Sequence, residues 1–343
     1  ACAGLAGPSA VAVDAAGRYL AFARETAPRR VGVCILDLDN PDAPPLDVPM
    51  EDGEIRSLAF SPDGDRLLTA SREGRARLLD TRDGQMLLAL PQEGPLRRPF
   101  NRAVFDGEGE RIAIAAADER VRVYDVDGEL LRELSQTRSA DRVVDLHKTA
   151  VRDVAFGPQG RYLVAVDDAG QVVRWDLSED ASATVIGQHE LSVEHAVLQP
   201  PARPGESALV LTASLDKTAR LWDFDSGREL AEFSHDAAVS DARFSTDGSR
   251  VLTRSDLDGS ARLWSVTPLS RVMHTLPHDD HVWHLDMAPA PDDGGDGRDI
   301  LWLATGSFSG SVKVWSYDRG SPDAVPEVLW DLLGHKDKVR RVG

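Results

Sequence analysis

The chain has 343 residues, 42% of them apolar, which is enough for one large all-β domain or for two smaller domains. Lysine and arginine number 39 against 57 aspartates and glutamates, so the formal net charge is −18. Such an acidic surface disfavours binding to nucleic acid or to an anionic membrane, because both need a positively charged face. No apolar stretch approaches the roughly 20 residues of a membrane-spanning helix.

The two cysteines, Cys2 and Cys34, have neither the spacing of a metal site nor that of a redox motif. So few cysteines in a chain of this length favour a reducing compartment, and we expect a cytoplasmic protein. The chain starts at Ala1 without the features of a signal peptide, and it stops inside a further copy of the repeat described next. We therefore expect it to be covalently part of a longer polypeptide.

A repeat runs through the chain. Each unit starts with a His-x-x-x-Val step, or a degenerate counterpart, and continues with short apolar runs separated by turn residues. The unit starts, which are 42 to 57 residues apart, are Gly4, Glu51, Leu96, His147, His189, His235, His278 and His335. Seven units are complete and an eighth has begun. No segment keeps a helical period of 3.6 residues, so each unit is expected to supply about four short antiparallel strands.

The first three units are the least regular. The first, residues 4–50, has two strands around Gly17 and a third strand after an insertion at residues 26–30. The second contains the turn Ser61-Pro62-Asp63-Gly64, in which proline presets φ and glycine tolerates a positive φ. The third is followed by an insertion, residues 136–146, that we expect to form an exposed loop.

The fifth unit is the most regular. Residues 208–213 are apolar, a turn follows at residues 214–217, and a second strand ends at Trp222-Asp223. The turn and the second strand carry the pattern Ser-x-Asp-x-Thr-x-Arg-x-Trp-Asp, and His189 stands upstream. At these residues the chain resembles the WD40 repeat family.

The resemblance implies a buried polar network in which a histidine, a serine, an aspartate and a tryptophan satisfy one another. In this chain the matching residues are His189, Ser214, Asp216 and Trp222. The Asp216 carboxylate would accept a hydrogen bond from His189, and Ser214 would link Trp222 to the network. The other units replace at least one position, as with Asp167 and Ala169 in the fourth unit, Asp256 in the sixth and Ser309 in the seventh. Packing is therefore expected to hold most units together.

The resemblance also implies the architecture, a seven-bladed β-propeller of four-stranded antiparallel blades over residues 1–335. Residues 336–343 would start a further repeat or serve as a closure segment. Stacking such sheets hides their faces and leaves only short edges exposed.

Motifs of enzymes and metal sites are weak in this sequence. It has no phosphate-binding loop, no GxGxxG, no HExxH and no GxSxG. His278, His281 and His284 recur every three residues. On a strand, side chains three residues apart point to opposite faces of the sheet, so we expect no metal site there. The aspartates of residues 292–299 do not follow the ligand spacing of an EF-hand loop, and we expect no cofactor. A basic residue recurs two positions before the aromatic position, and we expect a solvated strand face of Arg77, Arg122, Arg220, Arg262 and Lys313.

Partners of WD40 propellers often dock on the narrow face that carries the first-strand starts and the turns joining second and third strands. Mapped onto this chain, that face includes three arginines in units two to four, Arg56, Arg72 and Arg152. Units six and seven contribute Leu257, Trp283 and Phe308. Arginine and aromatic side chains are typical of binding hot spots, so we expect a protein or peptide partner here. The alternative is that Trp283 packs inside its own blade and that the arginines pair with neighbouring acids.

The sequence therefore favours a non-catalytic scaffold that recognises a protein or peptide. Its bias toward alanine, arginine, aspartate and glycine suggests a GC-rich bacterium, where similar arrays are often sensor domains of STAND-type signalling or defence proteins. Two alternatives stay open. One is an enzyme that uses the central channel, with Glu194, His195, His284 and Asp286 as candidates, and the other is a sensor of a small molecule or ion.

Overall fold

The computed structural model describes most of the chain. The described residues are 10–27, 30–40, 42–50, 53–91, 98–139, 142–145, 148–178, 182–199, 207–255, 257–266, 271–278, 280–289, 299–307, 311–321 and 324–333. The chain divides into two compact units after Ala196. The expected closure segment, residues 336–343, lies outside the described residues.

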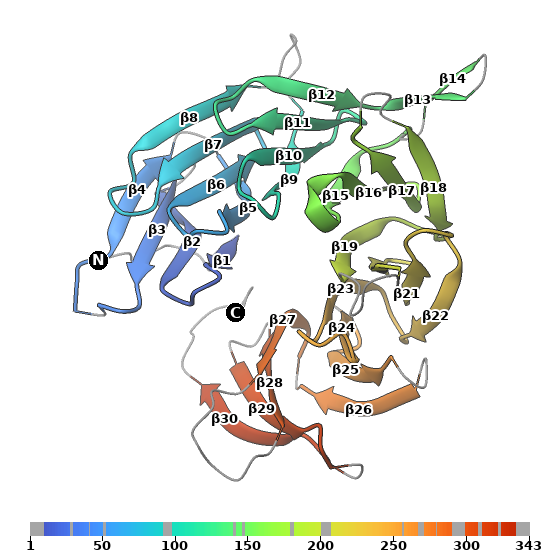
Figure 1. The fold of residues 1–343 in the computed structure, drawn as a ribbon. Coiled ribbons are helices and arrows are strands. Elements are labelled where there is room, and N and C mark those ends of the chain that lie inside the picture. The colour runs from blue at the N-terminus through green and yellow to red at the C-terminus, as the bar shows by residue number, and fades with distance from the viewer. Residues whose placement is uncertain are drawn as a thin grey trace. The chain divides into compact units, whose positions relative to one another are not determined.

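Seven four-stranded antiparallel sheets make up the described chain, together with one two-stranded hairpin and one short 3-10 helix (Figure 1). In every four-stranded sheet, strands that follow one another in the chain are hydrogen-bonded neighbours. The structure thus confirms the all-β class and the four-stranded antiparallel units, in the number that a seven-bladed WD40 propeller requires. None of the described helical residues forms a helix long and apolar enough to cross a membrane.

The first four sheets lie in the unit that ends at Ala196. Their strands are β1 (Val11–Val13), β2 (Tyr19–Ala27), β3 (Arg30–Asp37) and β4 (Leu46–Met50); β5 (Ile55–Phe60), β6 (Arg66–Ser71), β7 (Arg75–Asp80) and β8 (Met86–Pro91); β9 (Phe100–Phe105), β10 (Arg111–Ala116), β11 (Val121–Asp125) and β12 (Leu130–Leu134); β15 (Val151–Phe156), β16 (Tyr162–Asp167), β17 (Gln171–Asp176) and β18 (Ala183–Gln188). The 3-10 helix Pro158–Gly160 connects β15 to β16.

The remaining three sheets follow in chain order. Their strands are β19 (Val193–Gln199), β20 (Leu209–Ser214), β21 (Thr218–Asp223) and β22 (Glu229–Ser234); β23 (Val239–Phe244), β24 (Arg250–Ser255), β25 (Ser260–Ser265) and β26 (Arg271–Pro277); β27 (Val282–Pro289), β28 (Ile300–Ser307), β29 (Ser311–Asp318) and β30 (Glu327–Leu333).

Within each compact unit, the apolar core lies between successive sheets. In the first unit, Val33 of the first sheet packs in one cluster with Leu67 of the second. In the second unit, Leu221 of the fifth sheet shares a cluster with Val251 of the sixth. The second strand of the second sheet, β6, is buried on both faces, since five consecutive residues are buried. Each sheet therefore buries its faces only because another sheet covers them.

The turn at Ser61-Pro62-Asp63-Gly64 forms as the sequence predicts. The Gly64 N–H donates to the Ser61 carbonyl at 2.9 Å, and Gly64 adopts a φ of 76°. The Ser61 hydroxyl donates to Asp63 Oδ1 at 2.5 Å and accepts from the Arg66 N–H at 3.0 Å. This bond to the carboxylate holds the pKa of Asp63 below its usual value.

Two expectations from the sequence need correction. Part of the insertion at residues 136–146 is no loop, because β13 (Gln136–Ser139) pairs with β14 (Arg142–Asp145) as an antiparallel hairpin. Cys34 is fully buried in β3 and is disulfide-bonded. The small number of cysteines therefore gives no reason to expect a reducing compartment; Cys2 lies outside the described residues.

Candidate functional site

The sixth sheet holds a complete polar network of four buried or half-buried side chains. The Trp264 indole N–H donates to Thr253 Oγ1 at 2.7 Å, and Thr253 Oγ1 lies 2.6 Å from His235 Nε2. His235 Nδ1 lies 3.4 Å from Asp258 Oδ2. A carboxylate can only accept, so the ring proton sits on Nδ1, and Nε2 accepts the threonine proton. The network therefore runs from indole to hydroxyl to imidazole to carboxylate, with every donor matched.

Burial sets the charge state of this network. Desolvation of the fully buried His235 side chain, helped by the nearby Arg262 charge, lowers the pKa of His235 to about 4. Burial tends to raise the pKa of Asp258, but hydrogen bonds from the Ser260 hydroxyl and N–H outweigh it and hold that pKa below its usual value. The histidine is therefore neutral and the aspartate ionised near pH 7.

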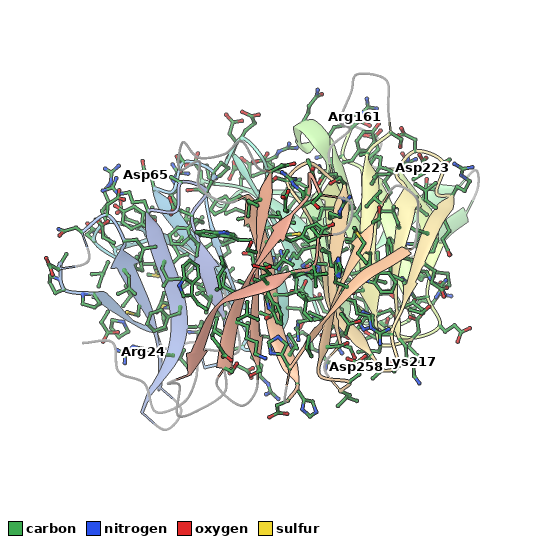
Figure 2. The ribbon with its side chains drawn as sticks, turned by 90° about the horizontal axis from the view of Figure 1, so that it is seen from below. Arg24, Asp65, Arg161, Lys217, Asp223 and Asp258 are labelled. Atoms are coloured by element: carbon green, nitrogen blue, oxygen red, sulfur yellow. The ribbon has the colours of Figure 1, made fainter. Side chains whose placement is uncertain are left out.

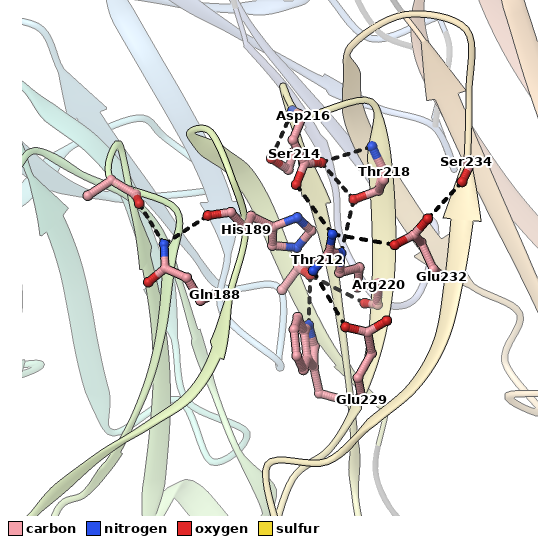
Figure 3. A network of polar contacts seen from close by, with 12 residues as sticks. Gln188, His189, Thr212, Ser214, Asp216, Thr218, Arg220, Glu229, Glu232 and Ser234 are labelled. Carbon is pink, nitrogen blue, oxygen red and sulfur yellow. Dashed lines mark hydrogen bonds and ion pairs between the residues drawn. The ribbon is translucent and has the colours of Figure 1, made fainter.

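The fifth sheet shows that the predicted role of Ser214 is wrong. The Trp222 indole N–H donates to Thr212 Oγ1 at 2.9 Å, rather than to Ser214 (Figure 3). Ser214 Oγ accepts instead from the Asp216 N–H at 3.1 Å. Asp216 Oδ1 accepts from the Thr218 N–H at 3.0 Å and from its hydroxyl at 2.6 Å. Ser214 and Asp216 thus order the turn, and the threonine receives the tryptophan.

His189, the histidine expected in the same network, is buried. Its N–H donates to the Gly170 carbonyl at 2.8 Å, and its own carbonyl accepts from Gln188 Nε2 at 2.8 Å (Figure 3).

The threonine was missed by sequence reasoning, although a signal for it exists. In the seventh sheet, Thr305 Oγ1 accepts from the Trp315 indole at 3.0 Å and lies 2.7 Å from His278 Nε2. The sequence repeats Thr-x-Ser at the end of four second strands, Thr69-Ser71, Thr212-Ser214, Thr253-Ser255 and Thr305-Ser307. A comparison of these strands with one another would have identified the threonine.

The fourth sheet has the tryptophan but lacks the threonine. Ala165 occupies the threonine position in β16, and Trp175 is fully buried in β17. Within the part of the chain that the structure describes, the Trp175 indole N–H has no hydrogen-bond acceptor. A buried donor without an acceptor costs stability, so this sheet relies on packing. His147 lies outside the described residues.

The repeated basic residues are less exposed than the sequence suggests. Arg122 is buried, and it contacts Asp118 Oδ2 at 2.6 Å and Glu133 Oε2 at 3.2 Å. Arg262 donates to Asp236 Oδ2 at 2.7 Å and to the Ser234 carbonyl at 2.9 Å. These side chains tie the third strand to its neighbours, which corrects the expected solvated face.

The six residues predicted to bind a partner have different environments. Arg152 pairs with Asp168 and lies 3.9 Å from Glu194 Oε1. Arg56 donates to Asn101 Oδ1 at 2.6 Å. Arg72 makes an exposed pair with Glu54 at 3.3 Å. All three arginines therefore have partners within the chain, and for Arg72 and Arg152 these partners are acids, as the alternative held.

The apolar members of that set are described only in part. Leu257 is 69% exposed. Trp283 lies in β27, but its side chain is outside the described residues, as is the whole of Phe308.

The candidates for a channel enzyme or a metal site also have structural partners. His195 Nε2 lies 3.6 Å from the buried carboxylate of Asp153, which accepts from the Ala196 N–H. Glu194 accepts from the Ser192 hydroxyl at 2.7 Å. Asp286 accepts from the Met287 N–H at 2.9 Å, and the side chain of His284 is outside the described residues.

The metal candidates do not come together among the described residues. His278 belongs to the polar network, and His281 Nδ1 contacts Asp280 at 2.6 Å. Asp299 accepts from Arg319 Nε at 3.0 Å, whereas Asp292, Asp293 and Asp296 lie outside the described residues. No group of three or more described histidines, cysteines or acids could hold a metal ion.

Comparisons with known proteins find matches to a repeat family and to several relatives. Three segments, residues 49–80, 140–176 and 227–265, match the family model described as WD domain, G-beta repeat. The chain is 26% identical over 286 residues to the guanine nucleotide-binding protein subunit beta of Solanum tuberosum, covering 82% of this chain and 69% of the relative. It is 28% identical over 267 residues to the nuclear distribution protein PAC1 of Arthroderma otae, covering 71% of this chain and 54% of the relative. It is 29% identical over 206 residues to the protein LST8 homolog of Drosophila melanogaster, covering 57% of this chain and 61% of the relative. The matched segments show that the chain contains WD40 repeats, and the third segment includes the tryptophan–threonine–histidine network of the sixth sheet.

Proposed function

We propose that this chain is a non-catalytic scaffold that binds a protein or peptide partner. The partner would contact the end of the sheets that carries the turns between second and third strands. The Solanum tuberosum relative supports this class of function, since its name makes it one subunit of a guanine nucleotide-binding protein. A cytoplasmic setting and a place in a longer, bacterial signalling or defence chain stay predictions.

The observation that carries the proposal is a pair of exposed leucines at equivalent turns of neighbouring sheets. Leu215 lies between β20 and β21 and is 38% exposed, and Leu257 lies between β24 and β25 and is 69% exposed. Their turn neighbours Lys217 and Asp258 lie at the same end of the second unit, opposite Asp223 (Figure 2). Apolar side chains that recur at exposed turn tips are what a partner can bury.

The arginine side of the predicted surface supports a second kind of contact. The Arg72–Glu54 pair is exposed, with 60% and 48% of the two side chains accessible. Exposed ion pairs contribute only about 0 to 1 kcal/mol. An acidic group of a partner could therefore exchange with Glu54 at little cost, whereas Arg152 is tied into a group with Asp168 and Glu194.

A pull-down from the native host extract, read by mass spectrometry, tests the proposal. The bait would be the wild-type chain, the double variant Leu215→Asp/Leu257→Asp, and a control with equal charge, Val185→Asp/Val328→Asp. The control valines are exposed on the outer strands β18 and β30. We expect a protein that the wild type and the control capture and the leucine variant loses. Equal capture by all three baits would show that the turns of Leu215 and Leu257 do not bind the partner.

A further inference from the structure

We propose that the outer strands β4, β8 and β12 form a second docking surface, for a protein segment in which apolar side chains are flanked by lysine or arginine. These strands follow one another along the outer edge of the first unit (Figure 1). The surface is distinct from the turns of Leu215 and Leu257, and it does not depend on the function proposed above.

Two glycines make these three strands into one continuous surface. A Cβ atom at Gly84 would lie 2.5 Å from Val48 Cγ2, and one at Gly128 would lie 2.9 Å from Leu88 Cδ1. The turn before β8 therefore packs directly on β4, and the turn before β12 packs directly on β8. Both glycines have positive φ values, 71° and 95°, so each turn is held in a conformation that favours glycine.

An apolar stripe follows from this packing. Met86 and Leu130 come two residues after the two glycines and are 53% and 38% exposed. Beside them, Leu46, Val48 and Leu88 are only partly buried against the cores below. Scattered apolar residues are ordinary on a surface, but these lie on three strands that the close approaches at Gly84 and Gly128 link into one row. The stripe is therefore suited to an apolar partner.

Acidic turns border the stripe. Asp83, Asp127 and Glu129 are exposed, and none of them belongs to an ion pair among the described residues. Backbone bonds fix these turns, since Asp83 accepts from the Gln85 N–H at 2.8 Å and Asp125 accepts from the Glu129 N–H at 2.7 Å. The nearest arginine of the turn, Arg82, is already paired with Asp65 at 2.6 Å.

The negative charge of the acidic border determines which kind of partner can bind the stripe. A second copy of the chain would bring another net charge of −18 to an acidic border, and an anionic membrane would meet the same repulsion. A segment that alternates apolar and basic side chains would bury Met86 and Leu130 while its cations meet Asp83, Asp127 and Glu129. Electrostatic complementarity of this kind favours the correct partner and speeds encounter.

Fluorescence anisotropy with two synthetic peptides tests the inference. One labelled peptide alternates leucine with lysine, and its twin has glutamate in place of every lysine. We expect the lysine peptide to bind the wild-type chain, with an affinity that falls as salt rises, and the glutamate twin not to bind. Met86→Ser/Leu130→Ser should weaken binding of the lysine peptide at least tenfold. Asp83→Asn/Asp127→Asn should weaken it and reduce its dependence on salt.

Matched controls separate the stripe from the general acidity of the chain. Val185→Ser removes an exposed apolar side chain of β18, and Asp225→Asn/Glu327→Gln removes two exposed charges in the other unit. Both controls should bind the peptide as the wild type does. The inference is overturned if the controls weaken binding as much as the stripe variants, or if Met86→Ser/Leu130→Ser has no effect. Self-association in sedimentation that this double variant abolishes would also overturn it, by making the stripe an interface between copies.

Discussion

A single threonine hydroxyl joins the tryptophan and the histidine of the sixth sheet, since Thr253 Oγ1 lies 2.7 Å from the Trp264 indole and 2.6 Å from His235. Thr253→Val keeps the shape but leaves both groups without their partner. We expect a loss of about 1 to 3 kcal/mol in the free energy of unfolding, the cost of stranding buried polar groups. Urea unfolding measures it, and Thr253→Ser, which retains the hydroxyl, should lose clearly less. Equal losses for valine and serine would argue that the hydroxyl has no role.

The fourth sheet offers the converse experiment. Ala165→Thr would supply the acceptor that the Trp175 indole lacks, whereas Ala165→Val adds the same bulk without the hydroxyl. The threonine variant should be more stable than the valine variant by about 1 kcal/mol, the usual net contribution of a hydrogen bond. The difference in urea midpoint between the two variants is the readout, because it cancels the effect of added volume. A valine variant as stable as the threonine variant would contradict the bond.

The buried histidine of the sixth sheet makes stability depend on pH. Burial lowers the folded pKa of His235 to about 4 from its ordinary value of about 6.5, so the unfolded chain binds the proton more readily. His235 therefore destabilises the fold as pH falls from about 6.5 to about 4, by up to about 3 kcal/mol. Unfolding free energies across this range, compared with those of His235→Gln, isolate the effect. A constant difference between wild type and variant would contradict a neutral buried histidine.

In the sixth sheet the sequence identified Trp264, His235 and Asp258, but in the fifth sheet it placed the hydroxyl at Ser214 rather than at Thr212. Thr212 and Ser214 are two residues apart and face the same side of β20, so the pattern alone cannot separate them. Strand register decides the matter. Val210 is the partner of Trp222 across the sheet, so Thr212 is the diagonal neighbour within reach of the indole, and Ser214 is four residues away.

At the scale of the element, turns with proline and glycine could be predicted and polar insertions could not. Ser61-Pro62-Asp63-Gly64 has residues whose φ preferences fix the backbone, and it forms the expected turn. Residues 136–145 mix polar and β-branched side chains, so their composition favoured a loop. Backbone pairing of β13 with β14 needs no apolar face, and such a hairpin leaves little trace in a hydrophobic pattern.

The turn between β16 and β17 should depend on glycine more than other turns do. Gly170 has a φ of 84°, and an added Cβ atom would lie 2.4 Å from the His189 carbonyl oxygen. Gly17 has a similar φ of 70° with nothing within 4 Å. Gly17→Ala should therefore cost only the strain of the left-handed conformation, about 1 to 2 kcal/mol, and Gly170→Ala clearly more. Thermal unfolding of the two variants makes the comparison. Equal losses of stability would mean that the backbone around Gly170 shifts at no cost to make room for the added Cβ atom.

At the scale of the whole molecule, the chain forms seven meander sheets, and within each of its two compact units successive sheets bury their faces against one another. The repeat spacing predicted these sheets because every unit needs the same four strands and the same turn chemistry. The recognition surface was harder to predict. The pairing of Arg152 with Asp168 and the exposure of Leu215 depend on neighbouring strands and turns that no single repeat specifies.

The most direct measurement of recognition by the turn face is the affinity of the captured partner for two variants of equal charge. Isothermal titration would compare Leu215→Asp/Leu257→Asp with Val185→Asp/Val328→Asp, after circular dichroism shows that both are folded. We predict that the leucine variant binds the partner about tenfold or more weakly, a loss of about 1.4 kcal/mol or more, and that the valine variant binds as the wild type does. Equal affinities for the two variants would contradict recognition through these turns.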